Sequence, residues 1–251
     1  MTVFPLTSAP EPFTVILSPF SLWYNERKTL GVIFLDTYDN TKEFWDNIFN
    51  KDSVKKAEDL DKDVKEALKW LSEDKNKIMD FGCGNGLLLI EALKENPKAR
   101  GFGIDISEEA VNLAEKNSKE NKVEERSNFR CGGVEVLKTI KDNKYEAVIL
   151  SNVLDSITSM DCYILLDHLK KIIKADGKIL IEVSPYMEKE DLIKAGAVML
   201  NDELFEGKEG LFLRNITSEK WLSMLGDYFE LVEKKEIGGN RLFLMSNKII
   251  M

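Results

Sequence analysis

The sequence has few histidines and cysteines, and this shortage of metal ligands excludes a whole class of site. Its 251 residues include one histidine and three cysteines, which are Cys83, Cys131 and Cys162. These cysteines are far apart and form no CxxC pair, so a zinc site built from Cys and His is not expected. An odd number of scattered thiols is typical of a reducing compartment. We therefore predict a cytoplasmic protein without a resident metal.

Long hydrophobic runs and an excess of basic residues are also absent. No uninterrupted apolar run approaches the ~20 residues that cross a bilayer. The start of the chain holds four of the six prolines and lacks the basic region of a signal peptide. Lys and Arg number 35 against 44 Asp and Glu, which gives a formal charge of −9. Because a negative protein repels a phosphate backbone, we expect neither a membrane nor a nucleic acid as the partner.

Apolar residues make up 43% of the chain, enough for a sizeable core, and their spacing follows two patterns. After residue 76, short apolar runs predict strands at 78–80, 100–106, 128–133, 145–152 and 178–183. Between these runs, helical spacing predicts helices at 87–95, 107–122 and 161–173. Strands that alternate with helices indicate a parallel sheet covered on both faces.

The two ends of the chain depart from this alternation. Residues 229–237 and 241–247 predict two strands joined by a glycine-rich turn, which is an antiparallel hairpin. Residues 185–216, before the hairpin, are predicted to form a lid. Residues 1–75 are predicted to form an N-terminal cap with helices, followed by one domain over residues 76–251. The fold class is α/β, a doubly wound, mostly parallel, seven-stranded Rossmann-like sheet with a C-terminal antiparallel hairpin and an N-terminal helical cap.

The stretch KIMDFGCGNGLLLIEAL, residues 77–93, places three glycines between the first predicted strand and a helix. Such a loop generally receives a nucleotide-like ligand at the carboxyl ends of the strands. A Walker loop needs Lys-Ser or Lys-Thr after its last glycine, where this chain has two leucines. A dinucleotide loop has the pattern GxGxxG, and Leu89 stands in place of its third glycine. NAD or FAD is therefore only a second choice.

The segment DFGCGNG, residues 80–86, is followed nineteen residues after Gly86 by Asp105 in GFGIDIS. This pair of motifs resembles the class I S-adenosylmethionine-dependent methyltransferases of the small-molecule type. The resemblance covers roughly residues 76–247. It implies that the glycines approach the methionine part of the cofactor, that Asp80 faces the cofactor's ammonium group or orders the loop, and that Asp105 accepts the ribose hydroxyls. The cofactor-binding residues that it implies are Asp80, Gly82, Cys83, Gly84, Gly86, Asp105, Ile106, Gly133, Val134, Ser151, Asn152 and Val153.

The later motifs depart from the family pattern. Gly133 stands where the family usually has an acid that touches adenine, so we expect backbone amides around Gly133 and Val134 to make that contact. ILSNVLDSI, residues 149–157, resembles the fourth family motif, which implies that residues 151–153 line the cofactor near its methyl group. Asp155 and Ser156 replace the usual Glu-His pair in that motif. A histidine base is therefore not expected there.

Catalytic and substrate residues are harder to assign, because methyl transfer from an activated sulfonium requires few particular side chains. Asp155 and Tyr186 are the candidates for a catalytic role, although Asp155 also suits a capping role and Tyr186 a packing role. Trp45, Tyr186 and Arg214 are candidates for contact with the substrate or within the lid. Trp45 is equally suited to anchoring the N-terminal cap.

The function predicted on these grounds is methyl transfer from S-adenosylmethionine to a small molecule. The two caps indicate an enclosed site, and the negative charge disfavours RNA. Two alternatives stay open. The first is a protein methyltransferase that acts on a lysine or a terminal amine, and the second is a non-catalytic module that binds S-adenosylmethionine.

Overall fold

The computed structural model describes residues 34–50 (side chains from Thr41), 60–208 and 210–247. The chain separates into two compact units, Met1–Asp39 and Asn40–Met251. The second unit holds both sheets and the helices that pack on them. The proline-rich start of the chain lies outside the described residues, and the predicted domain boundary at residue 75 stays a prediction.

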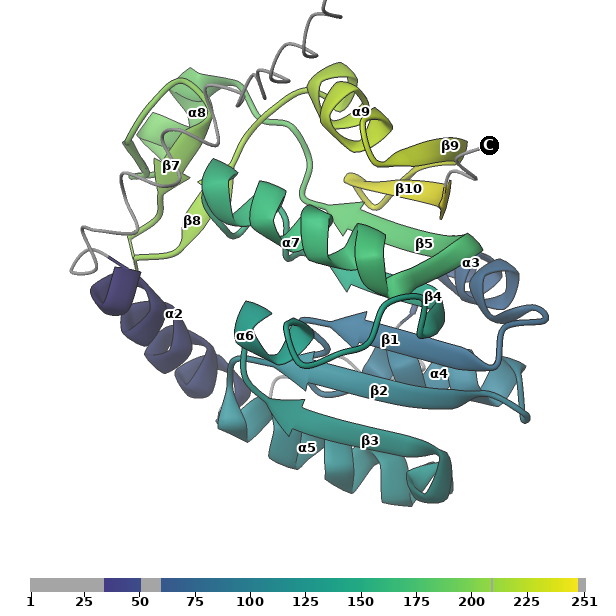
Figure 1. Cartoon of the computed structure of the whole chain (residues 1–251). Helices are drawn as coiled ribbons and strands as arrows, with labels where there is room; N and C mark the ends of the chain where they lie inside the picture. Colours follow the sequence, from purple (N-terminus) through teal and green to yellow (C-terminus); the bar gives the residue numbers. More distant parts are fainter. Residues whose placement is uncertain (1–33, 51–59, 209, 248–251) are drawn as a thin grey trace, which may run out of the picture. The chain divides into compact units, whose positions relative to one another are not determined.

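A seven-stranded sheet with the strand order β3-β2-β1-β4-β5-β10-β9 forms the centre of this unit. Its first five strands are parallel, whereas β10 runs antiparallel to both β5 and β9 (Figure 1). The predicted fold class is therefore confirmed, including the C-terminal hairpin. The strands are β1 Lys77–Phe81, β2 Arg100–Asp105, β3 Ser127–Cys131, β4 Tyr145–Ser151, β5 Ile173–Val183, β9 Phe229–Ile237 and β10 Asn240–Asn247.

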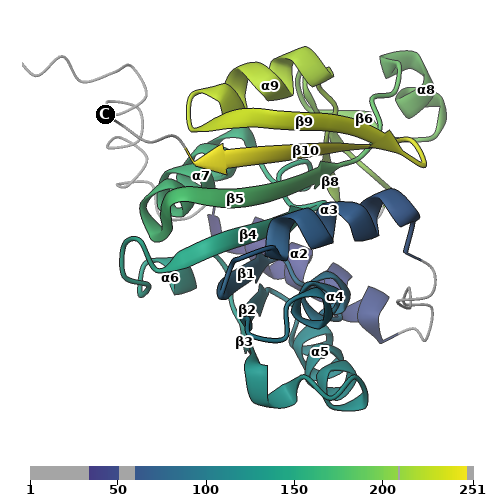
Figure 2. The ribbon, with the colours of Figure 1, turned by 90° about the vertical axis from the view of Figure 1, so that its right-hand side faces the viewer.

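Helices cover both faces of this sheet. On one face lie α3, α4 and α5, and on the other lie α6, α7 and α9. Figure 2 shows α4 and α5 on one side of β1, β2 and β3 and α6 on the other. The alternation within β1 explains the two layers, because Ile78 packs with α3 and α4 while Met79 packs with α7. The helices are α2 Phe34–Phe49, α3 Lys62–Ser72, α4 Leu87–Glu95, α5 Glu108–Glu120, α6 Val134–Leu137, α7 Ser159–Ile172 and α9 Ser218–Gly226, with a 3₁₀ turn η2 at Glu124–Arg126.

Short polar side chains fix where the helices next to the strand ends begin. Ser107 lies two residues after the end of β2, and its Oγ accepts the Ala110 amide 3.1 Å away, which starts α5. Thr158 starts α7 in the same way through the Asp161 amide. Both caps are readable in the sequence, and they place the helix N-termini beside the carboxyl ends of the parallel strands.

The predicted lid, residues 185–216, contains a small substructure of its own. It consists of α8 Lys189–Lys194 and a three-stranded antiparallel sheet of β6 Val198–Met199, β7 Leu204–Glu206 and β8 Phe212–Arg214. In Figure 1 this insertion lies on the left, the side toward which the parallel strands point. Its role as a lid stays a prediction.

Among the helices that the structure describes, none combines the length and the apolar run that a bilayer crossing requires. In the same part of the chain, no group of three or more His, Cys, Asp or Glu side chains gathers in a metal-binding arrangement.

Candidate functional site

The glycine loop between β1 and α4 is held tightly against its surroundings. The amides of Gly82 and Cys83 both donate to the carbonyl of Ile104 in β2, at 2.8 and 3.0 Å. Gly82 has a φ of +77°, and a Cβ on it would lie 2.3 Å from Cγ2 of Val153. Only glycine fits there. The contact brings the first and fourth predicted motifs together at the carboxyl ends of β1 and β4.

Asp105 ends β2 and fixes the glycine loop through its carboxylate. One oxygen accepts the Gly84 amide at 2.7 Å, and the other accepts the Ser107 amide at 2.9 Å. Burial raises the pKa of Asp105, and these two amides act in the opposite direction. Each carboxylate oxygen can accept a second hydrogen bond. The predicted contact with ribose hydroxyls is compatible with this arrangement and stays a prediction.

Asp80 is the most unusual group of the site. Its side chain is 1% exposed, and neither carboxylate oxygen has a hydrogen-bond partner among the described residues. Burial, followed by the charge of Asp105, raises the pKa of Asp80 to about 8. The amide of Leu89 in α4 favours the ionised form but does not reach hydrogen-bond geometry. A buried acid without a partner lacks a hydrogen-bond donor or a cation, which a ligand amine would supply.

The residues after β3 are held by their own loop. The Gly132 amide donates to the carbonyl of Asp105 at 2.8 Å. The Gly133 amide, a predicted adenine contact, donates to Glu135 Oε1 at 2.6 Å. Val134 is the first residue of α6. Glu135 was not predicted from the sequence. Its carboxylate accepts the backbone amide of Gly133, the residue that stands where the family usually has an acid.

The predicted cofactor residues after β4 meet a carboxylate that sequence reasoning missed. Glu182, near the end of β5, accepts the Ser151 hydroxyl at 2.6 Å and the Asn240 side-chain amide at 2.7 Å. Its backbone carbonyl accepts the Asn152 amide at 2.9 Å. Asn152 has a φ of +55°, an unusual value for a residue other than glycine. The only signal for Glu182 in the sequence is a charge that interrupts the apolar run KILIEV.

Asp155 lies where the insertion joins the sheet. Its side chain is 1% exposed, and Oδ2 accepts the Ser184 amide at 2.7 Å while its carbonyl accepts the Arg214 amide at 2.6 Å. Burial raises the pKa of Asp155, and the charge of Arg241 opposes this. Arg241 in turn donates to the carbonyls of Ser184 and Ile216. Asp155 and Arg241 thus hold together the two ends, or roots, of the insertion, at Ser184 and at residues 214–216. A catalytic role for Asp155 stays a prediction.

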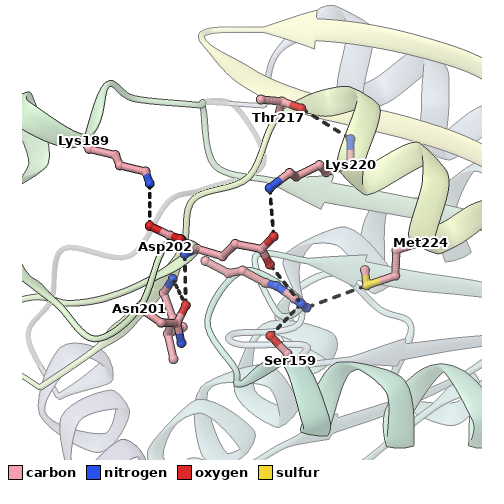
Figure 3. A network of polar contacts seen from close by, with 10 residues as sticks. Ser159, Lys189, Asn201, Asp202, Thr217, Lys220 and Met224 are labelled. Carbon is pink, nitrogen blue, oxygen red and sulfur yellow. Dashed lines mark hydrogen bonds and ion pairs between the residues drawn. The ribbon is translucent and has the colours of Figure 1, made fainter. Parts of the chain in front are cut away.

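Arg214, a predicted substrate contact, is buried in a polar network at the base of the insertion. Its guanidinium donates to Ser159 Oγ at 2.7 Å and to Met224 Sδ at 3.7 Å. Glu203 lies 3.8 Å from the same guanidinium and 3.0 Å from Lys220 (Figure 3). Because the side chain of Arg214 is only 4% exposed, these contacts account for its position without a substrate.

The aromatic candidates differ in their surroundings. Tyr186 follows the root of the insertion and is 39% exposed. The ring of Trp45 in α2 is half-buried and lies 6.1 Å from the ring of Phe49. The aromatic residue that contacts the glycine loop is Phe49, which was not predicted from the sequence. Its Cζ would lie 3.1 Å from a Cβ at Gly84.

Carboxylates therefore predominate at the carboxyl ends of the parallel strands. Asp80, Asp105 and Glu182 end or nearly end β1, β2 and β5. Arg214 and Arg241, beside the insertion, are at most 4% exposed and are bonded to other groups of the protein, whereas Arg130, next to last in β3, is exposed. An edge of this kind suits a cationic ligand better than an anionic one.

The chain matches a family model described as "Methyltransferase domain" over residues 72–227. It is 22% identical over 217 residues to a tRNA N(3)-methylcytidine methyltransferase of Schizosaccharomyces pombe, covering 83% of this chain and 71% of that protein. It is 30% identical over 126 residues to O-methyltransferase 3 of Dictyostelium discoideum, covering 48% of this chain and 28% of the relative. The chain thus spans less than a third of the latter protein.

Two solved structures share the fold. A SAM-dependent methyltransferase from Methanosarcina mazei aligns with a TM-score of 0.62 at 18% identity, over 77% of this chain and all of that one (100%). The 1,6-didemethyltoxoflavin-N1-methyltransferase of Burkholderia thailandensis, solved with 1,6-didemethyltoxoflavin and S-adenosylhomocysteine bound, aligns with a TM-score of 0.61 at 13% identity. That alignment covers 97% of this chain and 94% of the neighbour.

Proposed function

This chain belongs to the methyltransferase-domain family and is an S-adenosylmethionine-dependent methyltransferase, and from that premise we propose that its substrate is a small molecule. The cofactor supplies a methyl group already activated by its bond to a sulfonium. What remains for the protein is to hold the cofactor, to orient the nucleophile of the substrate and to exclude water.

The residues at the strand ends fit this cofactor. Asp80 is a buried carboxyl without a partner among the described residues, which matches the need of an amino-acid ammonium group for an acceptor. Gly82 and Gly84 carry no side chains of their own, so the backbone between them can lie close to a ligand on the sides that Val153 and Phe49 do not cover. We assign Asp105 to the ribose and residues 151–153 to the region around the methyl group, as the family resemblance implies.

Glu182 is the observation that carries the proposal about the substrate. Its carboxylate is held by two neutral donors, Ser151 and Asn240. No Lys, Arg or His of the described chain forms an ion pair with it. A half-buried carboxylate without a counter-ion favours a hydrogen-bond donor or a cation. We therefore propose that Glu182 orients a substrate whose nucleophile is an amine or a hydroxyl.

A nucleic-acid substrate is the second candidate, and the tRNA-methylating relative from Schizosaccharomyces pombe favours it. Electrostatics argue against it. The chain carries a formal charge of −9, and the carboxylate of Glu182 near the end of β5 would repel a phosphate backbone. A structural neighbour that aligns over 97% of this chain has a bound small molecule, which supports the small-molecule proposal. A protein amine is compatible with Glu182 as well, so the test must separate all three substrate classes.

The test uses the full chain and S-adenosylmethionine labelled on its methyl group. Three pools are offered separately: small amines and phenols, basic peptides, and total tRNA. We expect label to enter the small-molecule pool, and we expect Glu182→Gln to reduce its entry at least tenfold. The control Glu236→Gln, on the 67% exposed side chain of Glu236, should leave the rate unchanged. Label only in tRNA or only in peptides would contradict the proposal.

A further inference from the structure

Three residues of α2 lie on one face of that helix, and two of them contact the segments that follow β1 and β2. Lys42, Asp46 and Phe49 are spaced four and three residues apart, which places them on a common helix face. Phe49 contacts Gly84 after β1. Asp46 contacts Ser107 after β2. The face therefore crosses the edge of the sheet that the cofactor must reach.

Asp46 makes the polar contact of this face. Its Oδ1 accepts the Ser107 hydroxyl at 2.6 Å, and its Oδ2 accepts Lys42 Nζ at 2.7 Å. Burial alone would raise the pKa of Asp46, but the hydrogen bonds from Lys42 and Ser107 outweigh it and keep the pKa below its ordinary value. The Glu109 amide at the start of α5 acts in the same direction. Asp46 is therefore an ionised carboxylate in a charge-assisted hydrogen bond.

Phe49 and Lys42 extend the contact to either side. The Phe49 ring lies so close to Gly84 that a Cβ there would be 3.1 Å from Cζ. No ligand atom fits between the ring and the loop at this point. At the other end, the charge of Lys42 acts on the Cys131 thiol at the end of β3. Burial raises the pKa of that thiol, and the charge of Lys42 opposes the rise.

We propose that this face of α2 is a gate over the S-adenosylmethionine site and that the Asp46–Ser107 hydrogen bond is its latch. With the latch closed, residues 42–49 of α2 lie across the ends of β1 and β2, where Gly84 and Asp105 are expected to meet the cofactor. The cofactor enters and leaves only when α2 moves away. This inference rests on the identity of the cofactor and not on the class of substrate.

The first test measures the rate constants for binding and release of S-adenosylhomocysteine by the immobilised full chain, using surface plasmon resonance. In Asp46→Ala we expect both rate constants to rise about tenfold, the effect of losing one charge-assisted hydrogen bond from the closed state. The affinity should change less than about threefold. The controls Glu43→Ala and Asn47→Ala alter exposed residues of the same helix and should leave both rate constants unchanged.

Two results would overturn the gate. Unchanged rate constants in Asp46→Ala mean that the latch does not limit access. A faster release with unchanged binding means that Asp46 holds the cofactor directly. A melting curve for each variant establishes that the fold is intact before the rate constants are compared.

A second test does not depend on removing Asp46. Cys131 is exposed, whereas Cys83 and Cys162 are buried, and Lys42 acts electrostatically on the Cys131 thiol, so Lys42→Cys offers a second thiol for a cross-link to Cys131. A short bismaleimide should bridge the two thiols and fix α2 over the edge, with the bridge verified by peptide mass spectrometry. We expect the bridged free protein to bind S-adenosylhomocysteine at least tenfold more slowly, and protein bridged after loading to retain the ligand. Unaltered binding by the bridged protein would overturn the proposal.

Discussion

Asp80 makes a strong prediction about stability, because the free protein buries its carboxyl with no partner among the described residues. The pKa rises from 3.8 to about 8. Since each factor of ten in an acid constant is worth about 1.36 kcal/mol, ionising this group in the folded protein costs on the order of 5 kcal/mol relative to the unfolded chain.

The sign of the pH dependence follows from proton binding. Between pH 3.8 and about 8 the folded chain holds the Asp80 proton and the unfolded chain does not. The contribution of Asp80 to the free energy of unfolding therefore falls as the pH rises through this window, and it is constant above about pH 8. Replacement of Asp80 by asparagine keeps the size of the side chain and removes this dependence.

The assay is urea unfolding of the wild type and of Asp80→Asn, followed by circular dichroism at pH values from 5 to 9. We expect the variant to gain stability relative to the wild type as the pH rises, by on the order of 4 kcal/mol over this range. Any fixed cost of burying the amide cancels, because only the change with pH is compared. Asp142→Asn, at an exposed turn, serves as the control. A difference that stays constant within about 1 kcal/mol would refute the reasoning.

The same group predicts a proton linked to cofactor binding. An ammonium group beside Asp80 favours the carboxylate, so S-adenosylmethionine should displace the Asp80 proton and bind more tightly as the pH rises toward about 8. Calorimetric titrations at roughly pH 6.5 to 7.5, in the upper part of the window below the raised pKa, in buffers of different ionisation enthalpy measure the proton that is released. The proton release should be smaller in Asp80→Asn, and an equal release in both proteins would place the ammonium group elsewhere.

Three further predictions concern the loop and the roots of the insertion. Gly82→Ala should lower the free energy of unfolding by at least about 2 kcal/mol, because Gly82 has a φ of +77° and a Cβ there would lie 2.3 Å from Val153. The control Gly226→Ala should not lower it, because a Cβ at Gly226 meets nothing within 4 Å. Equal melting temperatures for the two variants would contradict this prediction. Asp105→Asn should weaken S-adenosylhomocysteine binding at least tenfold by calorimetry, since the charged acceptor of the Gly84 amide is lost, and an unchanged affinity would remove Asp105 from the cofactor site. Arg241→Met should lower the free energy of unfolding by about 2–4 kcal/mol and speed hydrogen exchange in residues 185–216, because the carbonyls of Ser184 and Ile216 lose their donor. Exchange that accelerates equally in β1 would point to general destabilisation instead.

The parts of the fold that the sequence predicted well are those with local signals. The helix predicted at 87–95 has the bounds observed for α4, because glycines precede it and Asn96 and Pro97 follow it. The strand predicted at 178–183 begins earlier, at Ile173. There the pairing of β4 with β5 shifts register, since Tyr145 pairs with Ile173 but Ala147 with Lys178. The polar residues of the shifted segment read as a turn in the sequence, and only the pairing with β4 makes them part of a strand.

The residues of the candidate site also fall into those with a local sequence signal and those that only the fold brings together. The glycine loop is one contiguous motif, so its residues can be named from sequence. Glu182 bonds to Ser151, which is 31 positions away, and Asp46 bonds to Ser107, which is 61 positions away. No local pattern links such pairs, because the fold creates their proximity. Arg214 is the opposite case, since its charge made it a candidate for substrate contact but the fold places it in a network of protein groups.

The period of two along the strands explains how Asp80 and Glu182 come to serve one site. Ile78, Ile149, Leu180 and Leu242 all belong to the apolar layer beneath α3 and α4. Two residues further toward the same edge, each of these strands presents a polar side chain to the same face, in the order Asp80, Ser151, Glu182 and Asn240. The apolar layer therefore ends in a staggered set of polar side chains on β1, β4, β5 and β10, in which only Ser151 and Glu182 pair directly. A cofactor amine at Asp80 and a substrate amine or hydroxyl at Glu182 would then lie on opposite sides of β4, the strand after which the methyl group is expected. In that arrangement Glu182→Gln should impair methyl transfer without weakening S-adenosylhomocysteine, whereas Asp105→Asn should weaken the cofactor product itself.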